Sequence, residues 1–282
     1  MNDRESPLPK ISVVVAVIDA VTCLKHCVES IIEQGYRQKE IIIIDGGSED
    51  GTVDLIKSYA HKIDYWESKK DRGICHAWNK AIEKVSGDWV LFLGADDWLW
   101  AKDTLENVAL RVSNAPQNQL LFYGNAIGVL ADDTKVGPLA QPWSYRKFLR
   151  GGMLFSHQGV LHSKELFRKY GCFDESLKIA GDYEFLLRVV RDSPPIYLQD
   201  IIITGVSLTG MSHEDDNSLL LYEEYVKAQR KNGLHSPLNL KWCLFKSWVK
   251  QLLLRKVNVR LMSSLLMFYR KATGRHKNWP GD

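Results

Sequence analysis

Two adjacent carboxylates follow an apolar run in the first half of the chain. The segment VLFLGADDWLW, residues 90–100, places Asp96 and Asp97 behind that run and two small residues. The run predicts a buried strand, and the segment after it predicts an exposed turn at the strand's carboxyl end. Two acids in such a turn either face solvent, because Asp favours turns, or hold a divalent cation through their oxygens.

Two more acids are expected at the same edge of a sheet. Asp45 follows the β-branched run EIIII, residues 40–44, and Asp71 lies in the loop ESKKDRG after a short strand near residues 63–66. The carboxyl ends of parallel strands meet at one edge, which is where open α/β sheets bind their ligands. We therefore expect Asp45, Asp71 and Asp96 to lie close together.

The elements that position these acids alternate between strand and helix. Near-continuous apolar strands separated by segments of helical spacing are typical of a mostly parallel sheet covered by helices on both faces. From about residue 115 the alternation weakens into an α+β pattern, which predicts a strand and hairpin in LLFYGNAIGVL, a strand in FSHQGVLH, and helices over 163–170 and 181–191. The expected fold class is α/β.

A glycine-rich phosphate loop is missing from the chain. The first predicted strand, ISVVVAV, continues as IDAVTCL without GxGxxG, which disfavours a dinucleotide-binding fold, and no Walker loop is present. A haloacid-dehalogenase-like phosphatase would need its nucleophilic aspartate at Gly94. The interpretation that remains is a carboxylate-held Mg²⁺ or Mn²⁺ that bridges a diphosphate and neutralises its charge as it leaves.

Composition narrows the class of protein further. The 282 residues are 45% hydrophobic, enough for a folded core, and the five cysteines form no CxxC pair, which favours a reducing compartment. Cys23 and Cys27 are interpreted as buried thiols rather than metal ligands. The polar N-terminus lacks the apolar core of a signal peptide, and no segment has the ~18 apolar residues of a membrane span. We therefore expect a cytoplasmic protein.

The C-terminal part is the basic part of the chain. Residues 234–281 contain ten Lys or Arg and no acid, so that residues 234–282 carry a net charge of +9 within a chain of +3. Trp, Phe and Leu interleaved with these charges over 237–277 predict helices that lie on the anionic inner face of a membrane or pack on the preceding domain. Nucleic acid is not expected, because no binding motif accompanies the charge. The expected organisation is a polar leader (1–10), two halves of one domain (11–115 and 116–230) and a basic helical tail (231–282).

Three motifs together resemble those of family 2 glycosyltransferases of the GT-A fold. They are DGGSEDGT at 45–52, SKKDRGICHAWNKAI at 68–82 and FLGADD at 92–97, in that order and spacing. The segment SHQGVLHSKELFRKYGCFDESLKIAGDYEFLLR at 156–188 resembles the acceptor-side block of the same enzymes, particularly the branch that builds bacterial surface polysaccharides. The resemblance spans about residues 10–210. It implies that the two expected halves bind a nucleotide-sugar (11–115) and an acceptor (116–230).

The resemblance implies a role for each matching residue. Asp45 would accept a hydrogen bond from the nucleotide base, Asp71 and Asn79 would line the donor pocket, and Asp96 would bind the metal. Asp182, in AGDYE, would be the catalytic base, which fits the need of an attacking sugar hydroxyl to lose a proton. The outcome would be inversion at the anomeric carbon.

Several other residues are weaker candidates. His157 and Gln158 are expected to contact the donor sugar or the acceptor, although a histidine on a predicted strand is more often structural. His213, in GMSHEDD, is a candidate third ligand of the metal. Glu184 and Asp174 are the alternatives to Asp182 as the base, and Asp182 itself could be a helix cap.

The chain also departs from the family pattern. Gly94 replaces the usual first acid of the DxD motif, Ile18-Asp19 replaces an aromatic-Asn pair, and Cys75-His76 replaces a Tyr-Asp pair. The predicted function is a Mn²⁺- or Mg²⁺-dependent inverting glycosyltransferase that moves a sugar from a nucleotide-diphosphate donor, favoured to be a UDP-sugar, to a saccharide or lipid-linked saccharide. The rivals are a sugar nucleotidyltransferase and an inactive scaffold that binds sugar or membrane.

Overall fold

The first half of the chain alternates between strand and helix as the sequence predicted. The computed structural model describes residues 8–208 and 218–256. Its first elements are β1 (Ile11–Val17), α1 (Leu24–Ile32), β2 (Lys39–Asp45), α2 (Thr52–Ser58), the 3-10 turn η1 (Ala60–Lys62), β3 (Tyr65–Ser68), α3 (Ile74–Ile82) and β4 (Trp89–Gly94). Strands β1, β2 and β4 are almost entirely buried, which explains their continuous apolar sequences.

The second half has a more irregular order. Its elements are β5 (Trp98–Leu99), α4 (Thr104–Ser113), β6 (Leu121–Val129), β7 (Lys135–Val136), α5 (Tyr145–Gly151), the 3-10 turn η2 (His157–Gly159), β8 (Val160–Ser163), α6 (Lys164–Tyr170), α7 (Gly181–Val189), β9 (Ile196–Ser207), α8 (Ser218–Lys231) and α9 (Leu238–Lys256). The expectation of a strand through FSHQGVLH was wrong at its start. His157 lies in η2, and the strand begins only at Val160.

The strands form one mostly parallel sheet, which confirms the predicted fold class. The order is β3-β2-β1-β4-β8-β6-β9-β5, with β7 paired to β6. Strands β1 to β4 are parallel to their neighbours within the group, and β6 and β9 are parallel to each other. Strand β8 runs antiparallel between β4 and β6, so it joins the two halves into a continuous sheet.

The register sets the carboxyl ends of the parallel strands side by side. Val17 at the end of β1 is opposite Asp45 of β2, and Asp45 is opposite Ser68 of β3. On the other side of β1, Ala16 is opposite Gly94. The segments that follow these residues therefore start from one edge of the sheet.

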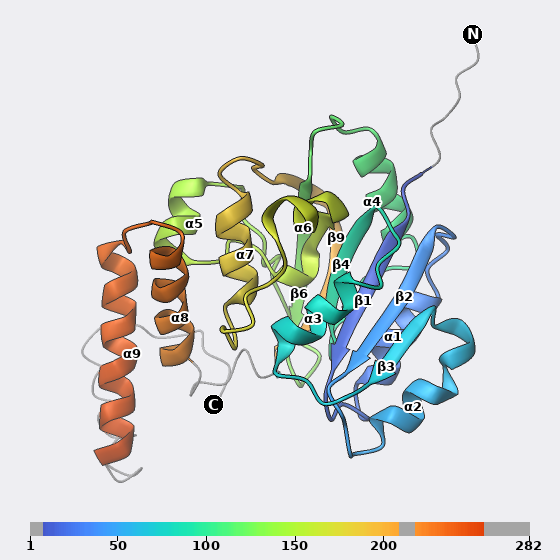
Figure 1. Ribbon diagram of the computed structural model, residues 1–282, viewed down its shortest axis with the longest axis horizontal. Helices are drawn as coiled ribbons and strands as arrows, with labels where there is room; N and C mark the ends of the chain where they lie inside the picture. The colour runs from blue at the N-terminus through green and yellow to red at the C-terminus, as the bar shows by residue number, and fades with distance from the viewer. Residues whose placement is uncertain (1–7, 209–217, 257–282) are drawn as a thin grey trace.

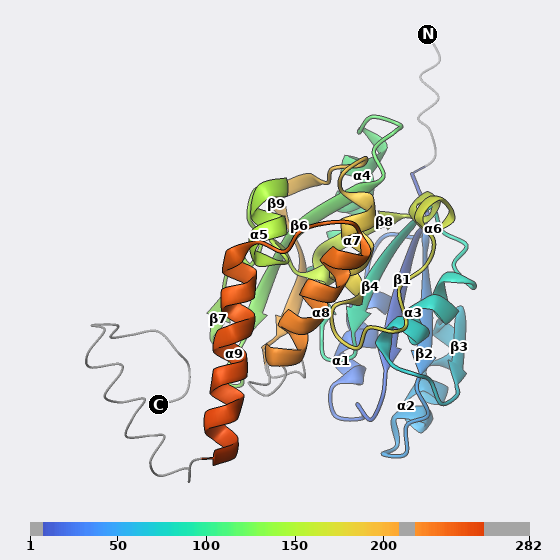
Figure 2. The same cartoon turned by 60° about the vertical axis from the view of Figure 1, so that its left-hand side comes forward.

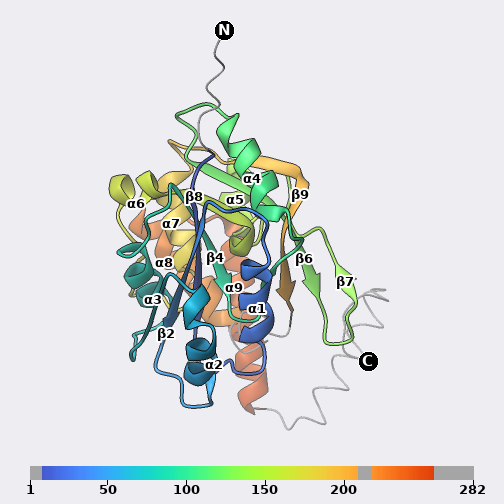
Figure 3. The same cartoon turned by 90° about the vertical axis from the view of Figure 1, so that its right-hand side faces the viewer.

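Helices cover both faces of the sheet. In the edge-on view of Figure 3, α1 and α4 lie on one face, and α3, α6 and α7 lie on the other. Alternate residues of β1 divide between the two cores: Val13 and Val15 face α1 and α4, whereas Val14 and Ala16 face the α3 side. The fold therefore buries both faces and leaves the carboxyl edge for the loops.

Helices α8 and α9 form a layer at the end of the molecule remote from α2 and β3 (Figures 1 and 2). They pack on each other and on α7 and α5. Among the residues that the structure describes, no helix is both long and apolar enough to cross a bilayer.

Candidate active site

The loop after β2 is organised around the carboxylate of Asp45. Asp45 is fully buried, and its Oδ2 accepts hydrogen bonds from the N–H groups of Gly47 and Ser48, both at 3.0 Å, and from the Ser68 hydroxyl at 2.6 Å. The Ser48 hydroxyl donates to Oδ1. Asp45 thus ties the loop after β2 to the end of β3. The resemblance assigned it to a nucleotide base, but the contacts that the structure shows are internal.

Asp71 lies directly against the residue that follows Asp45. A Cβ atom on Gly46 would be only 2.9 Å from Asp71 Oδ2, so the carboxylate uses space that glycine leaves. Asp71 Oδ1 accepts a hydrogen bond at 2.9 Å from the N–H of Gly73, the residue that directly precedes α3. The structure therefore brings Asp45 and Asp71 to the same edge of the sheet, with Asp71 half-buried.

The two acids after β4 close over Gly94. A Cβ atom at Gly94 would be 2.7 Å from Asp97 Oδ2 and 2.9 Å from Asp96 Oδ1. Asp97 is 2% exposed, whereas Asp96 is half-buried and therefore more accessible to solvent. The glycine that replaces the usual first acid of the motif is therefore what allows both carboxylates to sit above the end of β4.

Asp97 links this turn to the second half of the chain. Its Oδ2 accepts the N–H of Gly94 at 3.1 Å, and its Oδ1 accepts the N–H of Ser207 at the end of β9 at 3.3 Å. The side chain of Gln158 also hydrogen-bonds to Asp97. The resemblance assigned the metal to Asp96 alone, and the adjacency of Asp97 in the sequence was the signal for the second carboxylate.

The charge on this acidic turn is poorly compensated. Burial, followed by the negative charge of Asp96, raises the pKa of Asp97 to about 7. In residues 8–208 and 218–256, no cluster of three His, Cys, Asp or Glu side chains forms a metal site on its own. Carboxylate oxygens of this kind fit a divalent cation, which would need further ligands from water and from a bound diphosphate. Asp96 is the more exposed carboxylate of the two.

Asp182 lies in the first turn of α7, close to the start of α3. Gly181 packs so tightly on the Cys75 thiol that a Cβ atom there would overlap Sγ. Because α3 begins directly after the Asp71 loop, this contact places Asp182 on the same side of the molecule as the carboxyl edge of the sheet. Asp182 Oδ1 accepts the N–H of Tyr183 at 2.7 Å. Burial raises the pKa of Asp182 to about 6.

The two alternatives to Asp182 are engaged in structural pairs. Glu184 is fully buried and pairs with Arg188 at 3.0 Å. Asp174 pairs with Lys231 at 2.8 Å. Although burial opposes the change, hydrogen bonds from Lys231 and Ser176 lower the pKa of Asp174 to about 2, which makes it a weak base. Asp182 is the acid of the three that is neither paired with a cation in the described part of the chain nor lowered in pKa.

Comparison with known proteins identifies the family of the chain. The family described as "Glycosyl transferase family 2" matches residues 12–135. A relative described as an uncharacterized glycosyltransferase of Mycobacterium tuberculosis is 31% identical over 214 residues, which cover 75% of this chain and 80% of the relative. The chain belongs to glycosyltransferase family 2. A glycosyltransferase of PGL/p-HBAD biosynthesis from Mycobacterium bovis is 27% identical over 73% of this chain and 80% of its own length.

Solved structures share the fold of this family 2 glycosyltransferase. The mannosyltransferase PcManGT from Pyrobaculum calidifontis, in complex with GDP-Man and Mn²⁺, aligns with a TM-score of 0.64 at 17% identity over 94% of this chain and 81% of that one. S. aureus TarS 1–349 in complex with UDP-GlcNAc aligns with a TM-score of 0.60 at 16% identity over 85% of this chain and 71% of that one. At these identities the likeness concerns the fold.

Two of the predicted site residues of the glycosyltransferase make internal contacts. Asn79 accepts a hydrogen bond from the N–H of Phe173 at 2.9 Å and donates one to the Glu175 carboxylate at 3.0 Å. Its side chain therefore holds two residues of the loop before α7. His157 is buried beside Trp78, with ring centroids 4.8 Å apart, and burial lowers its pKa well below the usual range. Its position in η2 places it in the aromatic core. His213 lies outside the described residues.

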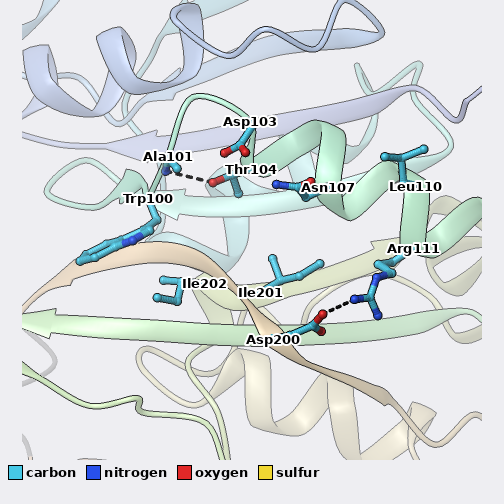
Figure 4. A pocket seen from close by; sticks show the side chains of 10 residues that line it. All are labelled: Trp100, Ala101, Asp103, Thr104, Asn107, Leu110, Arg111, Asp200, Ile201 and Ile202. Carbon is cyan, nitrogen blue, oxygen red and sulfur yellow. Dashed lines mark hydrogen bonds and ion pairs between the residues drawn. The ribbon is translucent and has the colours of Figure 1, made fainter.

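A separate cleft of the glycosyltransferase lies between α4 and β9. It has a volume of about 430 Å³ and is closed at one end by the ion pair of Arg111 with Asp200 (Figure 4). Its walls are Trp100 and one side of α4, and Ile201 and Ile202 line it from β9. The cleft contains none of the acids gathered at the carboxyl edge of the sheet.

Proposed function

We propose that this family 2 glycosyltransferase moves a sugar from a nucleotide-diphosphate donor to a saccharide hydroxyl with inversion at the anomeric carbon. The observation that carries the proposal is Asp182. Its carboxylate is half-buried, has no cationic partner among the described residues, and has a pKa raised to about 6 by burial. A base in this range is ionised at neutral pH and still basic enough to accept a proton.

The proposed reaction transfers one proton to Asp182 and leaves one electron pair on the departing diphosphate. The acceptor oxygen attacks the anomeric carbon on the side opposite the diphosphate, and its proton passes to an oxygen of Asp182. The new C–O bond forms as the bond to the diphosphate oxygen breaks, and the departing oxygen keeps the electron pair. Attack from the opposite side inverts the anomeric configuration.

The donor side of the proposal rests on the carboxyl edge of the sheet. Asp96 would hold Mn²⁺ or Mg²⁺, and a divalent cation there would neutralise the charge of the diphosphate. Asp71, over the end of β2, would line the nucleotide pocket. We favour a UDP-sugar as donor and a saccharide or lipid-linked saccharide of a surface polysaccharide as acceptor, with residues 11–115 and 116–230 as the donor and acceptor halves.

The first experiment screens donors. The parent protein is incubated with Mn²⁺ and, in turn, UDP-glucose, UDP-galactose, UDP-N-acetylglucosamine and GDP-mannose, and release of the nucleoside diphosphate is measured. A donor present at 100 times its dissociation constant should also stabilise the fold by about 2.7 kcal/mol. Binding without any turnover, including with saccharide acceptors, would favour the scaffold rival.

Asp182→Asn then tests the catalytic base. The N-cap of α7 is Ala180, so Asp182 is not the helix cap that the sequence allowed, and its Oδ1 accepts the N–H of Tyr183 within the first turn. Asparagine keeps an oxygen that can accept this N–H but cannot accept the acceptor's proton. We expect a melting temperature no lower than that of the parent, because a neutral amide replaces a half-buried charge, together with unchanged donor stabilisation and a loss of transfer of about 10²-fold or more. The matched control is Asp192→Asn, an exposed acid just after α7. Near-normal transfer by Asp182→Asn would remove Asp182 from the mechanism.

Helix α9 supports peripheral attachment of the enzyme to the inner face of a membrane. Leu240, Leu244 and Ser247 face the protein, whereas Leu238, Trp242, Phe245 and Trp248 are exposed, Leu238 to 84% and Trp242 to 57%. The three exposed aromatic rings lie in a row, with centroids 5.5 and 6.2 Å apart. Residues 238–256 hold five Lys or Arg and no acid, so an anionic lipid surface complements the charge as well as the apolar face.

Vesicle binding tests this attachment. The parent should sediment with vesicles that contain phosphatidylglycerol and not with pure phosphatidylcholine, and ~0.5 M salt should weaken the binding through screening. The double substitution Trp242→Ser and Phe245→Ser should reduce it. Leu110→Ser, which changes an exposed apolar residue on α4, is the control. If the double variant still binds vesicles, or instead turns an oligomeric parent into a monomer, the membrane assignment fails.

A further inference from the structure

Glu224 of α8 is a buried carboxylate that binds the backbone just before α7. It is 6% exposed. Its Oε1 accepts the N–H of Lys178 at 2.7 Å, and its Oε2 accepts the N–H groups of Ile179 and Ala180, both at 2.9 Å. Three successive amides thus satisfy one carboxylate, and charge-assisted hydrogen bonds of this kind are stronger than neutral ones.

The rest of the loop over residues 173–180 is held from two sides. From α8, Lys227 donates to the Ser176 carbonyl at 3.2 Å and Lys231 pairs with Asp174 at 2.8 Å. From the other side, Asn79 of α3 hydrogen-bonds to Phe173 and Glu175, and Arg72, in the loop before α3, pairs with Glu175. Of all these contacts, those of Glu224 are made with the residues that directly precede Gly181 and Asp182.

The surroundings of Asp182 include titratable groups from two other helices. The neutral thiol of Cys75 comes from α3, and the charged Glu224 and the neutral Tyr225 come from α8. Burial is the main cause that raises the pKa of Asp182, and the negative charge of Glu224 adds to it. The same charge contributes to the raised pKa of the Cys75 thiol, after burial and Asp182.

We infer that Glu224 is a positioning residue, which fixes the start of α7 through three backbone amides and thereby sets the place and charge environment of the Asp182 carboxylate. This inference rests on the proposed function of Asp182 as the base. No sequence motif marks Glu224, because its partners are backbone atoms 44 to 46 residues away.

The experiment compares Glu224→Gln with Glu223→Gln, an exposed neighbour on the same helix. Glutamine keeps the size but removes the charge and one acceptor. For Glu224→Gln we expect kcat to fall about tenfold with little change in KM for the donor that the screen identifies. The acid limb of kcat/KM should move to lower pH, because Asp182 loses a negative neighbour. The amides of residues 178–180 should exchange faster with deuterated solvent.

The possible outcomes separate a positioning role from a structural one. A lower melting temperature with an unmoved acid limb and unchanged exchange at residues 178–180 would overturn the inference, as would behaviour identical to that of Glu223→Gln. The more drastic variant Glu224→Ala removes both carboxylate oxygens. If that variant does not fold, the measurements on Glu224→Gln still test the inference. Normal transfer by Asp182→Asn would refute the proposed base, and with it the catalytic part of this inference, while amide exchange would still report whether Glu224 holds the loop.

Discussion

Buried carboxylates at the two edges of the sheet have pKa values shifted in opposite directions. At the amino edge, Glu40 is 5% exposed and accepts hydrogen bonds from Lys10 Nζ at 2.8 Å and from the Ser12 hydroxyl at 2.5 Å. Although burial opposes the change, these bonds and those from Ser86 lower the pKa of Glu40 to about 2. At the carboxyl edge, burial raises the pKa values of Asp97 and Asp182 to about 7 and about 6.

The difference lies in what each carboxylate has as partners. Glu40 is satisfied by an ammonium group, hydroxyls and backbone amides within the protein, so its charge stabilises the fold. Asp97 and Asp182 accept hydrogen bonds from backbone N–H groups, and neither pairs with a cation among the described residues. Uncompensated acids are characteristic of sites that bind a cation or move a proton. The amino edge is therefore structural, and the carboxyl edge is the candidate active site.

The largest expected effect on donor binding comes from Asp96 at the carboxyl edge. Asp96→Ala should lower the Mn²⁺-dependent affinity for the donor by about 10²-fold, because a charged ligand of the cation is lost. The melting temperature without ligand should stay the same, since Asp96 is half-buried and pairs with no cation in the described part of the chain. Calorimetric titration of the donor in the presence of Mn²⁺ measures this. Equal affinity in the variant and the parent would exclude Asp96 from the metal site.

The amino edge should show the opposite behaviour. Glu40→Gln should lower the free energy of unfolding at pH 7 by about 3 kcal/mol, because Lys10 and the amides around residue 86 lose an ionised partner, and should leave kcat unchanged. The folded pKa of Glu40 lies below its unfolded value near 4.5, so its contribution is present above pH 4.5 and is lost as the pH falls toward 2. Urea unfolding at several pH values tests this. A stability difference that does not shrink in acid would contradict the pairing.

Gly94→Ala should have a smaller effect on the same acidic turn. The added methyl group would lie 2.7 Å from Asp97 Oδ2 and 2.9 Å from Asp96 Oδ1, so the carboxylates must move. We expect about a tenfold loss of metal-dependent donor affinity, equivalent to about 1.4 kcal/mol. Gly35→Ala is the control, since its nearest neighbour would be 3.8 Å away. Unchanged donor affinity in Gly94→Ala would show that the position of the two carboxylates is not critical.

The local sequence was sufficient to predict the layers of the fold. Buried parallel strands need continuous apolar runs such as EIIII, so the alternation of the first half could be read directly, and with it the edge at which Asp45, Asp71 and Asp96 lie. Short segments were harder, because the pattern around His157 does not distinguish a 3-10 turn from a strand. The burial of Asp97 and the contact of Glu224 with residues 178–180 depend on tertiary packing, for which the sequence carries no periodic signal.

The pH dependence of kcat/KM decides whether Asp182 is the base. The base must be ionised to accept a proton, so transfer by the parent should fall about tenfold for each pH unit below a pKa of about 6, and should level off above it. The residual activity of Asp182→Asn should lack this limb, whereas that of Asp192→Asn should keep it. The same acid limb in Asp182→Asn and the parent would show that another group accepts the proton.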